Sequence, residues 1–510
     1  MAGEVKNEEI KDDLSSAIES AIFVFIGILI SSFSGLAERI TIARFLDPGL
    51  YGDVNIALAI LNLSSMIALF GLAQGVPRYM SRYDKIEDMR GVWFTGLVFS
   101  LLISGVVMML FLHDIELFTS NLMDTENAKG LLGLFLLSLP FFVGMRIGIG
   151  GIRGFENTVY RTYVKDIIYP IGRIILLMFF LFLGMNILAV GYAYLIACIL
   201  GFIFAHILLN RLMPLYGDVN YESVELIKFS LPLVFASLLF QLLVKTDTIM
   251  LGYFVDSYEV GLYSAAYPIS NMMILILSAF GFIFLPMTSR LDSEDKTENI
   301  DSIYKMTTKW IVVFTFPLFV TIITVPGQIL HLLFGSNFTA ASTALIIITV
   351  GFFARAIGGR NHEVLAAIGL QKYVLYSSFV AFIVNILLNI ILIPQLGIEG
   401  AAFASGTSFV LLNFVMVAVL SIKKGIYPVS QTMKRTIITL TVLVLIPVFA
   451  FTHLFTMKIF APLYIGIISS VLTVAVVVLF NCLEENDIIL VEVFESKTGL
   501  KIPFIRSFIP

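Results

Sequence analysis

The sequence carries little charge for its length. Only 13% of its 510 residues are Asp, Glu, Lys or Arg, whereas 58% are hydrophobic. A water-soluble protein of this size needs far more charged surface, so we expect no soluble part large enough for a catalytic domain and therefore no enzyme. The net charge is −4 and no dense basic stretch occurs. We therefore expect no nucleic-acid partner.

Cysteine is also scarce, because Cys198 and Cys482 are the only two and both lie in apolar runs. The absence of a Cys-x-x-Cys spacing and of any Cys/His cluster argues against a disulfide framework and a zinc site. We expect no metal and no cofactor. The first sixteen residues are too acidic for the n-region of a signal peptide, so we interpret the first apolar run as a retained membrane span.

Apolar runs of roughly 17–25 residues, the length that crosses a bilayer, are by contrast abundant. They predict an all-α polytopic membrane protein of about fourteen transmembrane helices. The expected spans are 17–40, 53–75, 91–112, 130–149, 166–184, 187–209, 226–250, 262–286, 310–333, 341–358, 373–394, 399–421, 435–455 and 460–482. The short links before the sixth and twelfth spans predict two tight helical hairpins.

Lys and Arg gather in the even-numbered links between these spans. The fourth link is an example, with Arg146, Arg153, Arg161 and Lys165, whereas the odd-numbered links hold one basic residue or none. The positive-inside rule then places both termini in the cytoplasm. We expect a multi-pass protein of the cytoplasmic membrane.

An internal repeat with an offset of 209 residues is the most informative feature. Segment 43–52 matches segment 252–261, and at the same offset Arg146 meets Arg355 and Gly191 meets Gly400. Each repeat holds six spans, an even number, so an axis along the membrane normal should relate the halves, with a central cavity at their interface. This predicts alternating access. The alternative, that the repeat only records how the protein arose, is disfavoured because duplicated six-span halves are typical of transporters.

The repeat divides the chain into five parts. These are a cytoplasmic N-terminal tail at 1–16, an N-lobe at 17–215, a C-lobe at 216–425, a further helix pair at 426–482 and a cytoplasmic C-terminal tail at 483–510.

Charged residues inside the spans mark the candidate site. An ionisable side chain at membrane depth costs about 2.5–3.5 kcal/mol on insertion scales, so it needs a partner or a watery cavity. Near the outer ends of the first and seventh spans, we expect Arg39 and Lys245 to contact an anionic substrate. There we also expect Glu38 or Asp247 to bind a proton or a sodium ion. The alternative is that these side chains snorkel to the headgroups.

Three further arginines complete the predicted site. Arg146 and Arg355 occupy matching positions at the inner ends of the fourth and tenth spans, and Arg173 lies inside the fifth. Because arginine keeps its charge, Arg173 should face the cavity or a carboxylate. Asp166, seven residues earlier and so on the same helix face, is a candidate partner for a buried structural pair.

Three segments resemble the polysaccharide transporter family, which includes the Wzx-type flippases and belongs to the multidrug/oligosaccharidyl-lipid/polysaccharide exporter superfamily. Segment 43–52, Ala-Arg-Phe-Leu-Asp-Pro-Gly-Leu-Tyr-Gly, is similar to the family signature A-R-x-L-G-P-x-x-Y-G. Segments 71–79 and 397–402 resemble the family as well. Asp47 stands where the family usually has Gly, at a turn.

The resemblance implies a flippase that moves a polyprenyl-linked oligosaccharide across the membrane for surface polysaccharide or glycoprotein synthesis. It also implies a cationic cavity for the headgroup, which Arg39, Arg146, Arg173 and Arg355 would furnish, and we place the lipid tail along the last two spans. The expected partners are the lipid-linked oligosaccharide and membrane lipids, and we expect a monomer. The alternatives are a cation-coupled multidrug exporter of the same superfamily and a membrane glycosyltransferase or polymerase.

Overall fold

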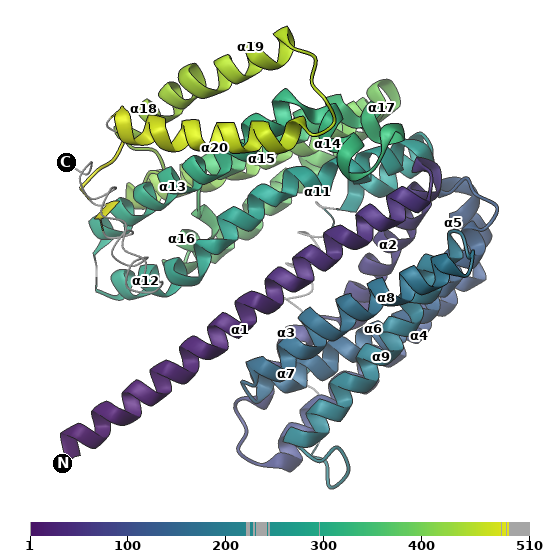
Figure 1. Ribbon diagram of the computed structural model, residues 1–510. Helices are drawn as coiled ribbons and strands as arrows, with labels where there is room; N and C mark the ends of the chain where they lie inside the picture. Colours follow the sequence, from purple (N-terminus) through teal and green to yellow (C-terminus); the bar gives the residue numbers. More distant parts are fainter. Residues whose placement is uncertain are drawn as a thin grey trace. The chain divides into compact units, whose positions relative to one another are not determined.

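The structure is a computed structural model. It describes residues 2–220, 225–227, 230, 242, 245–294, 296–480, 482–485 and 487–488, and their side chains except at 2–22, 25, 279, 281–283 and 285–287. Every regular element in these ranges is helical (Figure 1). The chain forms two compact units, Met1–Gly261 and Leu262–Pro510. The lobe boundaries given above stay predictions.

The first unit is built around one glycine-rich helix, α6. The helices described in it are α1 (Ala2–Phe45), α2 (Pro48–Leu69), α3 (Leu72–Met80), α4 (Ile86–His113), α5 (Ile115–Leu122), α6 (Ala128–Gly154), α7 (Thr158–Thr162), the π-helix η1 (Tyr163–Ile168), α8 (Tyr169–Phe182) and α9 (Leu188–Leu212), with a further helical stretch at 245–254. A Cβ atom at Gly144 or Gly151 would lie 2.6 or 2.8 Å from a side chain of α9, and one at Gly154 would lie 2.6 Å from Met80 of α3. The glycines therefore allow the close crossings that hold α6 in the centre.

The second unit contains helix α11 (Ser257–Ala279), which begins in the first unit. The helices that follow are α12 (Gly281–Ser293), α13 (Thr297–Thr324), α14 (Pro326–Leu333), the 3₁₀ helix η2 (Ser336–Ala341), α15 (Ser342–Ile357), α16 (Asn361–Ala367), α17 (Gln371–Lys424), α18 (Gln431–Leu440), the π-helix η3 (Thr441–Leu445), α19 (Ile446–Leu454) and α20 (Ala461–Leu479). Gly397, with φ 54°, breaks α17 into two helices, which gives the second hairpin that the sequence predicts.

The C-terminal end of the described chain is fastened to α13 by buried charges. Lys309 and Asp487 are 2% and 0% exposed, and the Lys309 Nζ lies 2.5 Å from Asp487 Oδ2. The indole N–H of Trp310 donates a hydrogen bond to Asp487 Oδ1 at 2.7 Å. The carboxylate is thus paired and hydrogen-bonded, as burial requires.

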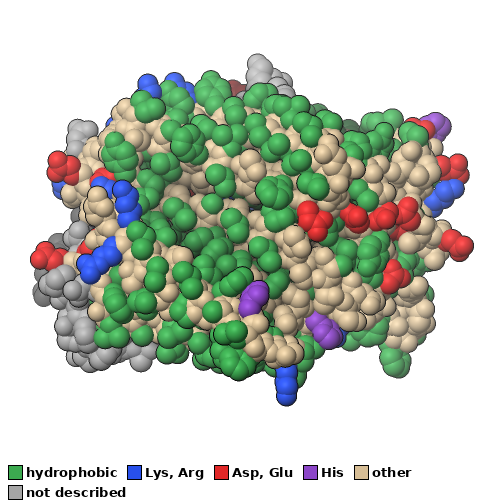
Figure 2. All heavy atoms as spheres, turned by 90° about the horizontal axis from the view of Figure 1, so that it is seen from above, with side chains coloured by type: hydrophobic (Ala, Val, Ile, Leu, Met, Phe, Trp, Pro, Cys, Tyr) green, Lys and Arg blue, Asp and Glu red, His purple; other side chains and the backbone are tan. Residues whose placement is uncertain are grey.

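Eleven helices in the described part of the chain are long and apolar enough to cross a membrane. One of them, α17, holds the predicted spans 373–394 and 399–421 on either side of Gly397, and η1 with α8 occupies the predicted span 166–184. Most of span 226–250 lies outside the described residues. The all-helical, polytopic fold is confirmed, whereas the number fourteen stays a prediction. Hydrophobic side chains are spread across the face shown in Figure 2, as suits an integral membrane protein.

The first turns of α2 and α11 cross with their backbones in contact. A Cβ atom at Gly52 would lie 1.7 Å from the carbonyl oxygen of Ser257, and one at Gly261 would lie 1.8 Å from the carbonyl oxygen of Pro48. Only glycine fits at either position. An aspartate caps each of the two helices. Asp47 accepts a 3.0 Å hydrogen bond from the backbone N–H of Leu50 in α2, and Asp256 accepts one of 2.8 Å from that of Glu259 in α11.

Asp53, next to this crossing, ties α2 to two other segments. Its carboxylate is fully buried and accepts hydrogen bonds from the backbone N–H of Thr125, at 3.2 Å, and from the hydroxyl groups of Thr125 and Ser257. Asp124 in turn accepts a 2.6 Å hydrogen bond from the backbone N–H of Ser257. The network fixes the start of α11 against α2 and the link before α6.

We predict that Gly52→Ala destabilises the protein by about 2 kcal/mol or more, because its Cβ would overlap a main-chain oxygen that cannot move alone. Thermal unfolding of the purified protein in detergent measures this. The matched control is Gly105→Ala in α4, where nothing lies within 4 Å and alanine is the better helix former. Equal unfolding temperatures for the two variants would contradict the prediction.

Candidate functional site

A cavity of about 640 Å³ in the first unit is lined by more cations than anions. Its polar and charged lining consists of four cations, one carboxylate, two amides and one hydroxyl residue, namely Arg146, Arg153, Arg161, Lys165, Glu156, Gln74, Asn157 and Thr158. Among the described residues no carboxylate forms a salt bridge with Arg146, Arg153 or Arg161. We call this cavity the cationic pocket. Its charge suits an anionic group such as a phosphate.

Helix α6 and the turn after it position these cations. Arg146 and Arg153 are seven residues apart, so they lie on one face of α6. The Arg146 guanidinium sits 5.3 Å from the centre of the Phe142 ring, and both terminal nitrogens of Arg153 lie 3.3 Å from Gln74 Oε1.

A tight turn joins α6 to α7. Glu156 has φ 56°, which reverses the chain after α6, and Asn157 accepts a 2.9 Å hydrogen bond from the N–H of Tyr160 and caps α7. The chain thereby returns along the pocket with Arg161 and Lys165 in its wall.

Arg173 does not line the cationic pocket. It forms a salt bridge with Glu38 of α1, and its guanidinium packs on the rings of Tyr194 and Tyr169, at 4.4 and 5.2 Å from their centres. Glu38 is 3% exposed, and one of its oxygens has no hydrogen-bond partner among the described residues. The two predicted site residues therefore neutralise each other and join α1 to α8.

Asp166 is not the partner of Arg173. Its Oδ1 lies 3.6 Å from Lys165 Nζ. The reason is η1: a π-helix has a wider turn than an α-helix, so residues seven apart across it do not share a face. The pairing considered from the sequence is wrong for this reason.

The remaining predicted residues lie elsewhere. In the first unit, Arg39 and Lys245 are partly exposed and close enough to repel each other electrostatically, and Asp247 is fully buried. In the second unit, Arg355 lies with its guanidinium 5.8 Å from the Phe409 ring centre. The predicted residues thus divide between the two units, and only Arg146 lines the cationic pocket.

Three cations of the pocket were not predicted to be site residues from the sequence, namely Arg153, Arg161 and Lys165. The sequence showed them only as basic residues of a cytoplasmic link, because the predicted span ended at residue 149. Helix α6 continues to Gly154. The spacing of seven between Arg146 and Arg153 was the available indication.

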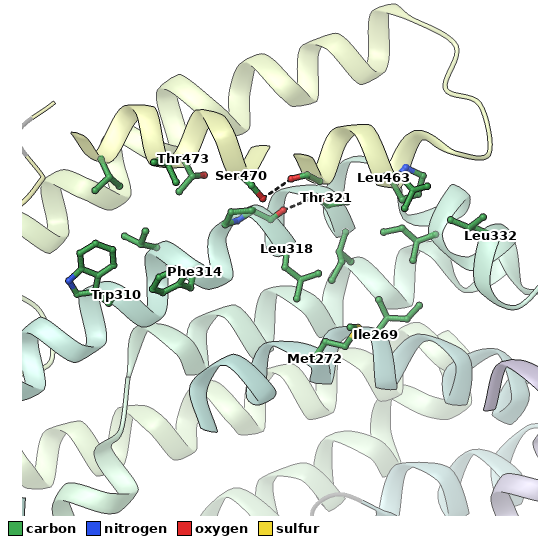
Figure 3. A pocket seen from close by; sticks show the side chains of 18 of the residues that line it. Ile269, Met272, Trp310, Phe314, Leu318, Thr321, Leu332, Leu463, Ser470 and Thr473 are labelled. Atoms are coloured by element: carbon green, nitrogen blue, oxygen red, sulfur yellow. Dashed lines mark hydrogen bonds between the residues drawn. The ribbon is translucent and has the colours of Figure 1, made fainter. Parts of the chain in front are cut away.

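A second cavity, of about 710 Å³, lies in the second unit and is almost entirely apolar. Figure 3 shows its walls: Trp310, Phe314 and Leu318 come from α13, Leu463 and Thr473 from α20. Ile269 and Met272 of α11 form another side. We call it the apolar groove. Two of its hydroxyl groups hydrogen-bond to the backbone: Thr321 donates to the carbonyl oxygen of Pro317 and Ser470 to that of Gly466, each at 2.7 Å.

No group of three or more metal-binding side chains occurs within the part of the chain that the structure describes. The two cysteines, Cys198 and Cys482, are buried and unpaired by disulfides.

Curated proteins with similar sequences are archaeal. The chain is 25% identical over 403 residues to the probable flippase AglR of Haloferax volcanii, covering 76% of this chain and 80% of that protein. It is 28% identical over 166 residues to the probable low-salt glycan biosynthesis flippase Agl15 of the same organism, covering 32% and 34%.

Solved structures share the fold. The lipid II flippase MurJ in an inward closed conformation matches with a TM-score of 0.73 and 17% identity, covering 89% of this chain and 98% of that one. An inward-facing multidrug resistance transporter of the MATE family matches with a TM-score of 0.67 and 17% identity, covering 82% and 99%.

Two family models match the sequence. The one described as MatE matches residues 232–391, and the one described as polysaccharide biosynthesis protein matches residues 17–292. The second model spans more than half of the sequence and includes the signature at 43–52, so the chain belongs to the polysaccharide biosynthesis protein family.

Proposed function

We propose that the protein is a flippase that carries a lipid-linked oligosaccharide across the membrane, with the anionic headgroup held in the cationic pocket. The observation that carries this proposal is the charge of that pocket: Arg146, Arg153 and Arg161 have no ion-pair partner among the described residues. Uncompensated cations in one wall favour a diphosphate, whose oxygens accept several charge-assisted hydrogen bonds at once. The similarity to proteins named as flippases points the same way.

The apolar groove supplies a place for the lipid. It lies between α13 and α20, the last of the helices outside the repeat, and its lining is apolar. A polyprenyl chain gains about 0.8 kcal/mol for each buried methylene group, although lipid tails offer a similar environment. The groove therefore aligns the tail more than it attracts it. This agrees with the expectation that the last two spans hold the tail.

The finer parts of the proposal rest on the sequence. The positive-inside rule favours the cytoplasmic membrane, cytoplasmic termini and a cationic pocket that opens to the cytoplasm. Arg39, Lys245 and Arg355 are proposed to contact the substrate later in transport. Glu38 and Asp247 are proposed to couple transport to a proton or sodium gradient, and the protein to act as a monomer without a cofactor.

Multidrug export is the less favoured function. A pocket for cationic drugs needs carboxylates, but the cationic pocket has one carboxylate, Glu156, in its wall against four cations. A glycosyltransferase or polymerase needs catalytic acids in a large loop, and the described links between spans are short.

We predict that Arg153→Gln combined with Arg161→Gln lowers the flipping rate by about tenfold or more, since hydrogen bonds to charged groups contribute about 1.5–3 kcal/mol each. The measurement follows a fluorescent polyprenyl diphosphosugar in proteoliposomes by its access to an external quencher. Lys129→Gln, which removes a cation from an exposed salt bridge with Glu116, is the matched control. Unchanged flipping by the double variant would refute the cationic pocket as the headgroup site.

We further predict that Gly466→Leu lowers the flipping rate of long-chain substrates but not that of short-chain ones. A leucine at this position would fill the apolar groove, because the nearest atom to a Cβ there is Thr321 Oγ1 at 3.7 Å. Flipping of a long-chain substrate should fall several-fold, because a filled groove no longer aligns the tail, and that of a two-isoprene analogue should not change. Val471→Leu, which alters an exposed position of α20, is the control. Equal effects on both substrates would contradict a role for the groove in binding the tail.

A further inference from the structure

A buried carboxylate lies next to two cations of the cationic pocket. Asp166 is 2% exposed, and its Oδ2 has no hydrogen-bond partner among the described residues. Helix α1 covers it: a Cβ atom at Gly27 would lie 3.3 Å from Asp166 Cβ and 2.3 Å from the neighbouring Thr162. This carboxylate differs from that of Asp53, whose oxygens accept hydrogen bonds from two other segments of the chain.

Two cations face Asp166. Lys165, on the same π-helix, has its Nζ 3.6 Å from Asp166 Oδ1, and Arg146 of α6 is close enough to interact with it electrostatically. Both cations also line the cationic pocket. Lys165 is 39% exposed on its side chain, so its ammonium group has room to turn toward the pocket. Lys165 therefore lies between the buried carboxylate of Asp166 and the pocket, where an anionic headgroup would bind.

We infer that Asp166 is the internal counter-ion of the cationic pocket and that it takes up a proton when an anionic headgroup binds. The inference rests on the proposed function and deepens it. In the empty pocket, Lys165 pairs with Asp166. When a diphosphate enters, the Lys165 ammonium turns to the phosphate oxygens and keeps its charge.

The buried Asp166 carboxylate then loses the ammonium group of Lys165, and the guanidinium of Arg146, which also lines the pocket, is drawn to the diphosphate as well. An unpaired carboxylate in a buried position is strongly destabilised and binds a proton instead. One proton moves from solvent to the Asp166 carboxylate, and no bond of the substrate changes. Substrate binding and proton uptake become linked, so the affinity should fall as the pH rises, by up to about tenfold per pH unit.

The test is titration calorimetry of the full-length protein in detergent with geranyl diphosphoglucose, whose disubstituted diphosphate keeps its charge throughout the neutral range. Binding is measured in two buffers of different ionisation enthalpy, which gives the number of protons bound. The wild type should take up close to one proton per ligand. Asp166→Asn should take up none and bind about tenfold more tightly, because the internal competitor for Lys165 has lost its charge.

Lys165→Gln separates this role from a merely structural one. It should also abolish proton uptake, because Asp166 would already be protonated, but it should weaken binding where Asp166→Asn strengthens it. Lys129→Gln should behave as the wild type does. Wild-type binding without proton uptake, or uptake that persists in Asp166→Asn, would overturn the inference and leave the proposed pocket standing. Failure of the wild type to bind the probe would overturn both.

Discussion

The cost of placing charge in an apolar interior governs this structure. Two enclosed cations are each accompanied by a carboxylate: Arg173 is paired with Glu38, and Lys309 with Asp487. These pairs join helices that are distant in sequence, α1 to α8 and the C-terminal segment to α13. In the cationic pocket, by contrast, Arg146, Arg153 and Arg161 have no salt-bridge partner among the described residues and line an open cavity. The cost of burying charge thus distinguishes the paired charges, which stabilise the fold, from the pocket cations, which are available to bind a ligand.

The fold was largely predictable, because hydrophobic length and the distribution of Lys and Arg are strong signals in membrane proteins. The hairpin at Gly397 and the close crossings of α6 follow from local sequence. The pairing of charges was not predictable. Whether Arg173 meets Asp166 or Glu38 depends on one π-helical turn, and no composition or spacing announces such a turn. The apolar groove could not be found either, since its lining residues look like any others in an apolar span.

The two repeats differ at the candidate site. Arg146 and Arg355 match at the offset of 209 residues, but Arg153, Arg161 and Lys165 correspond to His362, Leu370 and Val374. Three of the four pocket cations therefore have no cationic counterpart in the second repeat. The proposed substrate, with a charged head and a long tail, is itself asymmetric.

The crossing of α2 with α11 joins equivalent positions of the two repeats. Pro48 contacts Gly261 and Gly52 contacts Ser257, and these are equivalent positions at the offset of 209 residues. Reciprocal contact between equivalent residues is the mark of an isologous interface between two copies of one chain. Two separate copies of a single repeat could make the same contact, and each copy would then need glycine at this position.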